Sequence, residues 1–290
     1  REKDAKWQND ELERAKAKAS SQTSGSTSDE VEDLTQKILA SIIPSSKLLK
    51  RKTTKRRKII DPWLMAGQIS MIFSDPGKGK TMLALIIATL VTRRDKISSL
   101  PQMGLWAVEH KASTLYVDGE IGSDDVKERL KGLELNCGRG SKKYPLNILC
   151  AEEFAKLNNE QIYITNPTFR EALSNAIKVS GVGLLILDNI SSLTLAIDEN
   201  TKKDWDQIND WLVFLKQEKV SVILIHHAGK NGSKRGTGTR EINLHSVLKL
   251  LSPKNSKPWQ GAQFKTEFKK FRGRPSEKLR DLMWKITEDD

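Results

Sequence analysis

Short apolar runs alternate with segments of helical periodicity along residues 59–290. Each run is rich in Ile, Leu and Val and is bounded by polar or turn-forming residues, as is typical of a buried strand. The segments between the runs repeat apolar side chains every three or four residues, which predicts helices. The predicted strands are residues 69–73, 114–119, 183–188, 220–226 and 246–251, and the predicted helices are residues 82–90, 124–133, 167–179 and 202–217. Such alternation favours a mostly parallel twisted sheet flanked by helices on both faces.

The C-terminal part of the chain follows a different pattern, because apolar and polar residues alternate along it. This alternation occupies residues 263–271 and 282–286, and Gly273, Arg274 and Pro275 lie between the two segments. Strand periodicity on both sides of a turn predicts an antiparallel hairpin, added here to the edge of the sheet. We therefore predict an α/β fold: a mostly parallel twisted sheet flanked by helices, with an antiparallel C-terminal hairpin extension.

Residues 1–58 form a separate N-terminal segment in this interpretation, and residues 59–290 form the main domain. The segment opens with charged residues interspersed with alanine, over residues 1–20, and continues into a Ser-rich linker over residues 20–28. A short amphipathic helix follows the linker.

The helix is predicted from apolar residues at helical spacing, preceded by Thr27 and Glu30 at the spacing of a capping box. The apolar residues are Val31, Leu34, Ile38 and Ile42. Such a helix either packs against the main domain or docks on a neighbouring subunit, and the sequence does not separate the two roles.

A dense basic run, KLLKRKTTKRRK, occupies residues 47–58. A solvated linker arm is one interpretation. The other is a clamp on a nucleic-acid backbone, in which each neutralised phosphate releases counterions.

Composition adds a strong positive charge to this picture. The chain has 290 residues, a formal net charge of +12 at pH 7 and a pI of about 9.5. A balance this basic is common in proteins that meet nucleic acid or an anionic surface. The chain begins with Arg1, so we expect it to be a piece of a longer protein.

Other classes of protein are disfavoured by what the sequence lacks. Its two cysteines, Cys137 and Cys150, form no C-x-x-C pair and indicate neither a zinc site nor a disulfide. We find neither an apolar run long enough to cross a membrane nor a signal peptide. The expected localisation is cytoplasmic, without a membrane partner.

The chemistry of the chain centres on the stretch ISMIFSDPGKGKTMLAL, residues 69–85. A strand, a glycine-containing loop, Gly-Lys-Thr and a helix follow one another, which is the context of a phosphate-binding P-loop. The glycines let backbone N–H groups turn toward an anion, and the N-terminus of the helix points its positive end at the same place. The predicted nucleotide-binding residues are Asp75, Pro76, Gly77, Lys78, Gly79, Lys80, Thr81 and Met82.

Within this loop, Lys80 is expected to reach the β- and γ-phosphates of ATP, and the Thr81 hydroxyl to hold Mg²⁺. One residue departs from the pattern, because Ser74 occupies the position of the first glycine. Serine disfavours a positive φ, so we expect the turn to differ slightly there.

Carboxylates follow two of the predicted strands at the edge where open α/β sheets bind ligands. Asp188 ends the strand GLLILD and is placed to hold Mg²⁺ through water. Glu120 follows the strand TLYVDG and is the favoured group to orient or deprotonate the attacking water. Its competitors are Asp118, which should point the other way, and the pair Asp124 and Asp125, which suit the start of a helix.

Two histidines, His226 and His227, end the next strand. Either could contact the γ-phosphate or its attacking water, or be a satisfied polar tip of the strand. No third ligand at zinc spacing accompanies them. The following residues, AGKNGSKRGTGTRE, combine glycines with Lys230, Lys234, Arg235 and Arg240. This loop suits contacts to phosphate, of a neighbour's nucleotide or of a DNA strand, unless it is only a solvated surface loop.

Taken together, these motifs resemble the RecA-like hexameric P-loop ATPases, and most closely the RepA-type replicative helicases with their AAA domains. The resemblance covers residues 62–286, in the segments WLMAGQISMIFSDPGKGKT, LYVDGEIGSDDVKERL, GLLILDNISSL and VILIHHAGKNGSKRGTGTRE followed by VLKLL. It implies a RecA-like fold with nucleotide bound between subunits. It also implies single-stranded DNA in a central channel lined by loops at residues 191–203 and 228–242.

The resemblance assigns roles residue by residue. Lys80 and Thr81 are the Walker A residues, Asp188 the Walker B acid, Glu120 the catalytic carboxylate and His227 the sensor. Arg129 falls where the group often has an arginine of uncertain role.

A catalytic arginine finger is expected from the neighbouring subunit, because no arginine follows the P-loop closely in its own chain. Arg235 is the first candidate, with Arg240 and Lys249 as the others. A hexameric ring follows from this expectation. The resembling group also includes enzymes fused behind a primase domain, so the resemblance implies a possible primase domain or partner upstream.

The leading hypothesis is a nucleic-acid motor: a replicative DNA helicase of a plasmid, phage or integrated element that hydrolyses ATP with Mg²⁺. The alternative is an ATP-gated regulatory or scaffold protein that binds DNA without unwinding it. A nucleotide kinase is disfavoured, because no lid with paired arginines follows the P-loop.

Overall fold

The computed structural model describes residues 26–52, 56–93, 102–137, 140–194, 202–228, 243–253 and 263–286. It divides into two compact units, Arg1–Lys55 and Arg56–Asp290. The predicted boundary after Lys58 therefore falls slightly late. Lys58 is the first residue of strand β1 (Lys58–Asp61), and its Nζ donates to Asp61 Oδ1 at 2.7 Å, so it belongs to the second unit.

The N-terminal unit contains α2 (Ser26–Ser41) and α3 (Ser45–Lys50). The predicted amphipathic helix is confirmed, but it begins at Ser26, so Thr27 lies inside it and is not the N-cap of a capping box. Val31, Leu34 and Ile38 are each more than half exposed, so α2 presents an apolar stripe that nothing described in this unit covers.

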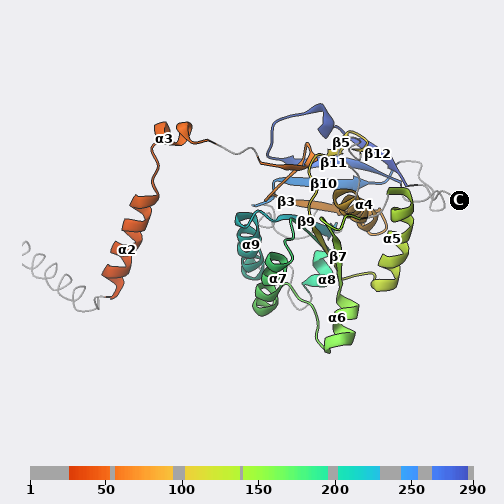
Figure 1. Ribbon diagram of the computed structural model, residues 1–290, viewed down its shortest axis with the longest axis horizontal. Helices are drawn as coiled ribbons and strands as arrows, with labels where there is room; N and C mark the ends of the chain where they lie inside the picture. The colour runs from red at the N-terminus through yellow and green to blue at the C-terminus, as the bar shows by residue number, and fades with distance from the viewer. Residues whose placement is uncertain are drawn as a thin grey trace, which may run out of the picture. The chain divides into compact units, whose positions relative to one another are not determined.

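The second unit is built on an eight-stranded sheet with the order β12-β11-β10-β3-β9-β8-β6-β7 (Figure 1). The strands from β10 to β7 in this order run parallel, whereas β11 and β12 are antiparallel. The predicted parallel sheet and C-terminal hairpin are therefore confirmed. The strands are β3 (Ile69–Ser74), β6 (Thr114–Asp118), β7 (Leu146–Cys150), β8 (Leu184–Asp188), β9 (Ser221–His227), β10 (Ser246–Leu251), β11 (Gln263–Phe271) and β12 (Leu282–Lys285).

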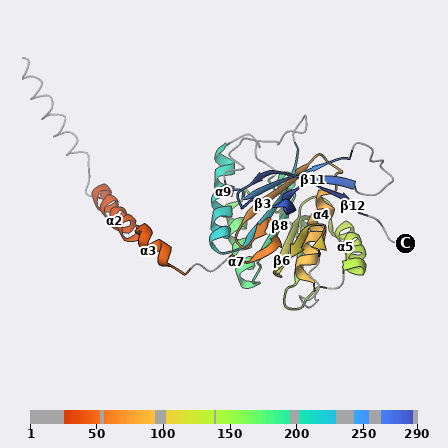
Figure 2. The same cartoon turned by 90° about the horizontal axis from the view of Figure 1, so that it is seen from above.

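Helices cover both faces of this sheet. α4 (Lys80–Thr92) and α5 (Ser123–Cys137) lie on one face, and α7 (Pro167–Val179) and α9 (Lys202–Gln217) lie on the other (Figure 2). The shorter helices are α6 (Ala151–Asn158), α8 (Ile190–Leu193) and the 3-10 turn η4 (Glu277–Leu279).

Period-two alternation along the buried strands gives each face its own apolar core. In β3, Ile72 packs in the core beneath α4, whereas Met71 and Phe73 pack in the core beneath α7 and α9. The strands are buried on both faces, so polar groups are confined mainly to their ends.

A second, four-stranded sheet with the order β2-β1-β5-β4 was not predicted. It adds β2 (Leu64–Met65), β4 (Gln102–Met103) and β5 (Trp106–Val108) to β1. These strands are too short to show a readable alternation in sequence.

An aromatic cluster joins this small sheet to the C-terminal hairpin. The ring of Trp106 lies 5.4 Å from Trp63, 5.8 Å from Phe268 and 5.1 Å from Trp284, measured between centroids. Trp106 is fully buried, and its Nε1 donates to the Lys278 carbonyl at 3.1 Å. Among the described residues, no helix is both long and apolar enough to cross a membrane.

Replacing Trp106 with alanine should lower the free energy of unfolding by about 3–5 kcal/mol, because it leaves a large cavity in this cluster. Met283→Ala, at a side chain of the same hairpin that is 62% exposed, is the control and should change little. Denaturant titration measures both values. A loss below about 1 kcal/mol for Trp106→Ala would contradict the packing described here.

Candidate nucleotide-binding site

The P-loop connects β3 to α4 and has the backbone that its glycines permit. Gly77 has φ 71° and Gly79, the N-cap of α4, has φ 82°. Both values lie in the left-handed region, where a residue with a side chain is disfavoured. The loop therefore requires glycine at these two positions, as the sequence predicted.

Ser74 does not disturb the turn, and the expected local difference is wrong. It is the last residue of β3, paired in register with His227, and its φ is not positive. Its Oγ donates to the Asp75 carbonyl at 2.9 Å and accepts from Lys80 Nζ at 3.3 Å. Serine thus adds a hydrogen-bond acceptor for the lysine at a position that makes no conformational demand for glycine.

Lys80 is held inside the loop. Its Nζ donates to the carbonyls of Ser74 at 3.2 Å and of Asp75 at 3.0 Å, and the residue is only 5% exposed. Burial lowers the pKa of Lys80, while the negative charges of Glu120 and Asp188 oppose that shift. The ammonium group is therefore poorly solvated and suited to an incoming anion.

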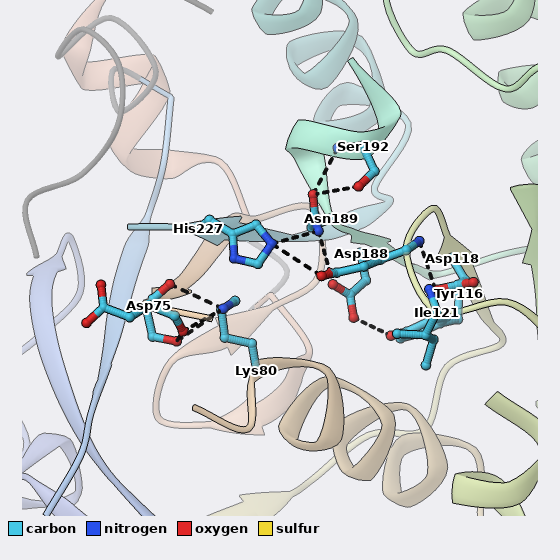
Figure 3. A network of polar contacts seen from close by, with 11 residues as sticks. Asp75, Lys80, Tyr116, Asp118, Ile121, Asp188, Asn189, Ser192 and His227 are labelled. Atoms are coloured by element: carbon cyan, nitrogen blue, oxygen red, sulfur yellow. Dashed lines mark hydrogen bonds and ion pairs between the residues drawn. The ribbon is translucent and has the colours of Figure 1, made fainter. Parts of the chain in front are cut away.

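Asp188 ends β8 at the same edge of the sheet (Figure 3). Tyr116 Oη donates to Asp188 Oδ2 at 2.5 Å, whereas the buried Oδ1 has no hydrogen-bond partner among the described residues. Burial raises the pKa of Asp188 to about 6, and the interactions with Tyr116 and Thr81 reduce that shift.

A buried carboxylate oxygen without a partner, close to a threonine hydroxyl, fits a hydrated divalent cation. Asp188 and Thr81, the predicted Mg²⁺ residues, are thus brought together.

Asp118 and Glu120 have different environments, although they are close in sequence. Asp118 is buried and accepts hydrogen bonds from the backbone N–H groups of Glu120, Ile121 and Gly122, at 3.3, 3.2 and 2.9 Å. It therefore stabilises the turn that follows β6. The Glu120 side chain is 38% exposed and lines the cleft beside the P-loop, so the geometry favours Glu120 over Asp118 as the group that meets water.

The other competing acids are accounted for by α5. Asp124 and Asp125 lie in its first turn, where negative charge is favourable next to the N-terminus of a helix.

Asn189 is a site residue that the sequence analysis missed. Its Nδ2 donates to Glu120 Oε2 and lies 3.0 Å from His227 Nε2, and the Asp188–Asn189 peptide bond is cis. The available signal was its place directly after the strand-end acid. An amide at a strand end gives no chemical signal of its own, and the role of Asn189 arises only from these contacts with Glu120 and His227.

These groups surround a cleft of about 350 Å³. The lining residues are Gly77, Lys78, Gly79, Lys80, Thr81, Met82, Glu120, Ile121, Arg129 and His227. Of the predicted nucleotide-binding residues, Asp75 and Pro76 are not in this lining. Arg129 of α5 lines the cleft, so an arginine of the same chain lies near the P-loop although none follows it closely in sequence.

The candidates for a charge supplied to a neighbour are placed only in part. Arg235 and Arg240 lie outside the described residues, as do Lys230 and Lys234 of the same basic loop. Lys249 lies in β10 opposite Phe73 of β3, with its Nζ 5.9 Å from the centroid of the phenyl ring.

The sheet, the P-loop and the strand-end acid together define a P-loop NTPase of the RecA-like α/β class. The profile of the AAA domain family AAA_25 matches residues 37–233, and the chain belongs to this family. No curated protein sequence gives a significant match.

Among solved structures, the KaiC-like protein PH0186 from Pyrococcus horikoshii OT3 is similar in fold, with a TM-score of 0.56 and 17% identity. That match covers 81% of this chain and 97% of the other.

Asp188→Asn should stabilise the nucleotide-free protein at pH 8. The folded-state pKa of about 6 lies above the ordinary value of 3.8, so stability is lost as the pH rises between these values. Removing the ionisable group should recover up to about 3 kcal/mol above pH 6 and nothing below pH 4. Unfolding experiments at several pH values measure the difference. Asp124→Asn, at an exposed acid, is the control, and a less stable Asp188→Asn at pH 8 would contradict the assignment.

Glu120→Gln should retain ATP binding but lower turnover by roughly 10²-fold or more, the scale of losing a general base. A fluorescent ATP analogue measures binding, and phosphate release measures turnover. Asp118→Asn is the comparison. If it alone carried this phenotype, the face of β6 that meets the nucleotide would have been misassigned.

Proposed function

We propose that this protein is an ATP-dependent nucleic-acid motor, a replicative DNA helicase of a plasmid, phage or integrated element. The observation that carries the proposal is the meeting of Lys80, Thr81, Glu120 and His227 around one cleft at the carboxyl ends of the parallel strands. This is the edge at which open α/β sheets bind ligands.

The chain supplies a group for each part of phosphoryl transfer to water. The N-terminus of α4 and Lys80 receive the phosphates, and Lys80 neutralises charge that develops on the γ-phosphate. Glu120 orients the attacking water and accepts its proton. His227, at the end of β9, lines the same cleft, where it would contact the γ-phosphate.

Thr81 and Asp188 are the residues that would hold Mg²⁺, the first directly and the second through water. The ion would neutralise phosphate charge when bound. Within the described part of the chain, the buried Asp188 Oδ1 accepts no hydrogen bond, and Tyr116 donates to the other oxygen. This chain therefore presents an oriented carboxylate beside Thr81.

The step from ATPase to helicase rests on charge and on the resemblance to the RepA-type helicases. A net charge of +12 and the basic run at residues 47–58 suit a polyanionic track of single-stranded DNA. On this proposal the protein forms a ring, most simply a hexamer, with ATP hydrolysed at subunit interfaces. It would act in the cytoplasm, with a primase domain or partner upstream.

We expect ATP turnover per subunit to rise with protein concentration and with added single-stranded DNA, and a forked duplex to be unwound. DNA affinity should fall steeply with salt, by about 0.7 in log affinity per phosphate contact for each tenfold rise in salt. Lys80→Ala should abolish turnover and unwinding, and is the control. ATP-dependent DNA binding without unwinding would instead favour a regulatory or scaffold protein.

Mixtures of variants test where the catalytic cation comes from. Lys80→Ala subunits have an inactive P-loop but an intact finger. We therefore mix them in turn with Arg235→Ala, Arg240→Ala and Lys249→Ala subunits. Turnover should recover in part only in the mixture whose second variant lacks the finger, because some interfaces then regain both parts. Arg129→Ala tests for a catalytic cation of the same chain. If Arg129 acts in its own cleft, mixing Arg129→Ala with Lys80→Ala subunits should restore no turnover, because each cleft still lacks one of the two residues. Turnover independent of concentration, without rescue in any mixture, would argue against the ring.

A further inference from the structure

The side-chain amide of Asn189 lies between the two groups expected to act on the attacking water and the γ-phosphate. Its Nδ2 donates to Glu120 Oε2 and lies 3.0 Å from His227 Nε2 (Figure 3). His227 Nε2 and Glu120 Oε1 are 3.5 Å apart, so the amide nitrogen lies closer to each of the two groups than they lie to each other. Asn189 is thus the bridge between β9 and the turn after β6.

The orientation of this amide is set by chemistry. Asn189 Oδ1 accepts from the backbone N–H of Ser192 at 2.9 Å and from the Ser192 hydroxyl at 3.2 Å, and so caps helix α8. A backbone N–H requires an acceptor, so the oxygen faces Ser192 and the nitrogen faces the cleft. The two N–H bonds of Nδ2 are then available for Glu120 and His227, one for each. Asn189 is 1% exposed, so water does not compete for them.

This arrangement also selects the protonation state of the histidine. Because Asn189 Nδ2 can only donate, a hydrogen bond between them requires His227 Nε2 to accept, and this would leave the imidazole neutral with its proton on Nδ1. A proton on Nε2 would instead point at Glu120 Oε1 and engage the carboxylate directly. The amide therefore separates an acid from a base that would otherwise pair with each other.

We propose that Asn189 is a positioning residue for hydrolysis. Its amide nitrogen holds the Glu120 carboxylate in place and keeps His227 neutral, so that Glu120 and His227 do not form an ion pair with each other. The proposal rests on the proposed function, because it assigns Asn189 a role in the same reaction. It predicts that the loss of one donor nitrogen affects the chemical step and leaves nucleotide binding intact.

Asn189→Asp tests the role of the donor, because aspartate has the same shape and still caps α8 through Ser192 but cannot donate. We expect kcat to fall by about 10²-fold, the scale of misplacing a catalytic group by about 1 Å. The KM for ATP should stay within about threefold. Adding Asn189→Asp to Glu120→Gln should cause less than the additive loss, because Asn189 acts in part through Glu120.

Thr194→Val is the matched control for damage to α8. Thr194 is buried in the residues just after that helix and donates to the Ile190 carbonyl at 2.8 Å, but it does not line the cleft. Its loss should lower the melting temperature without changing kcat. Wild-type kcat in Asn189→Asp, or full additivity with Glu120→Gln, would overturn the proposal.

Nitrogen-15 NMR of the histidine side chains tests the bridge without reference to activity. In the wild-type protein, His227 should carry its proton on Nδ1, and Asn189→Asp should abolish this tautomer. A wild-type His227 protonated on Nε2 would refute the bridge whatever the kinetics. If the wild-type protein hydrolysed no ATP while this tautomer was observed, the proposed function would fail and the bridge would stand.

Discussion

The site depends on burial of both faces of the parallel strands. β3, β8 and β9 are apolar along almost their whole length, so their polar groups are concentrated where the strands end. Parallel direction brings these ends to a single edge, and the register places Ser74 beside His227 and Asp118 beside Asp188. The N-terminus of α4 meets the same edge. The cleft is therefore a consequence of strand direction and strand order, and its residues need not be close in sequence.

Desolvation at this edge sets the chemistry of the site. Burial lowers the pKa of Lys80 and raises that of Asp188, so each group is less favourable in its charged form than it would be in water. The two groups do not form an ion pair that relieves this penalty: Lys80 donates to loop carbonyls, and Asp188 accepts from Tyr116. Phosphate and a hydrated cation are the partners that would relieve both. The desolvation of these two groups lowers the stability of the free protein, and relief of this cost on binding would contribute to the affinity for nucleotide.

Sequence reasoning identified the long, strongly patterned parts of the fold. The bounds of α7, α9, β10 and β11 were predicted correctly, because each has sustained periodicity or sharp turn signals. β7 was missed since it is an edge strand whose apolar run is interrupted by Asn147, and only contact with β6 defines it. Among the site residues, the P-loop was readable because its residues are contiguous. Asn189 was not, since its role arises from contacts with Glu120 and His227, which are distant in sequence.

Arg129 changes the argument for a catalytic neighbour. The expectation of a trans-acting cation rested on the lack of an arginine close behind the P-loop in sequence, since Arg129 follows the P-loop only after β6 and lies in α5. Folding places it in the lining of the same cleft as Lys80. The cleft lining therefore already includes a cation from α4 and one from α5. The number of cations in the cleft does not by itself require a second subunit. A ring is required only if the cation that acts on the leaving and attacking oxygens must come from a neighbouring subunit. In-line phosphoryl transfer needs positive charge placed along the line from the attacking to the leaving oxygen. A cation that lies off this line cannot replace one supplied across a subunit interface.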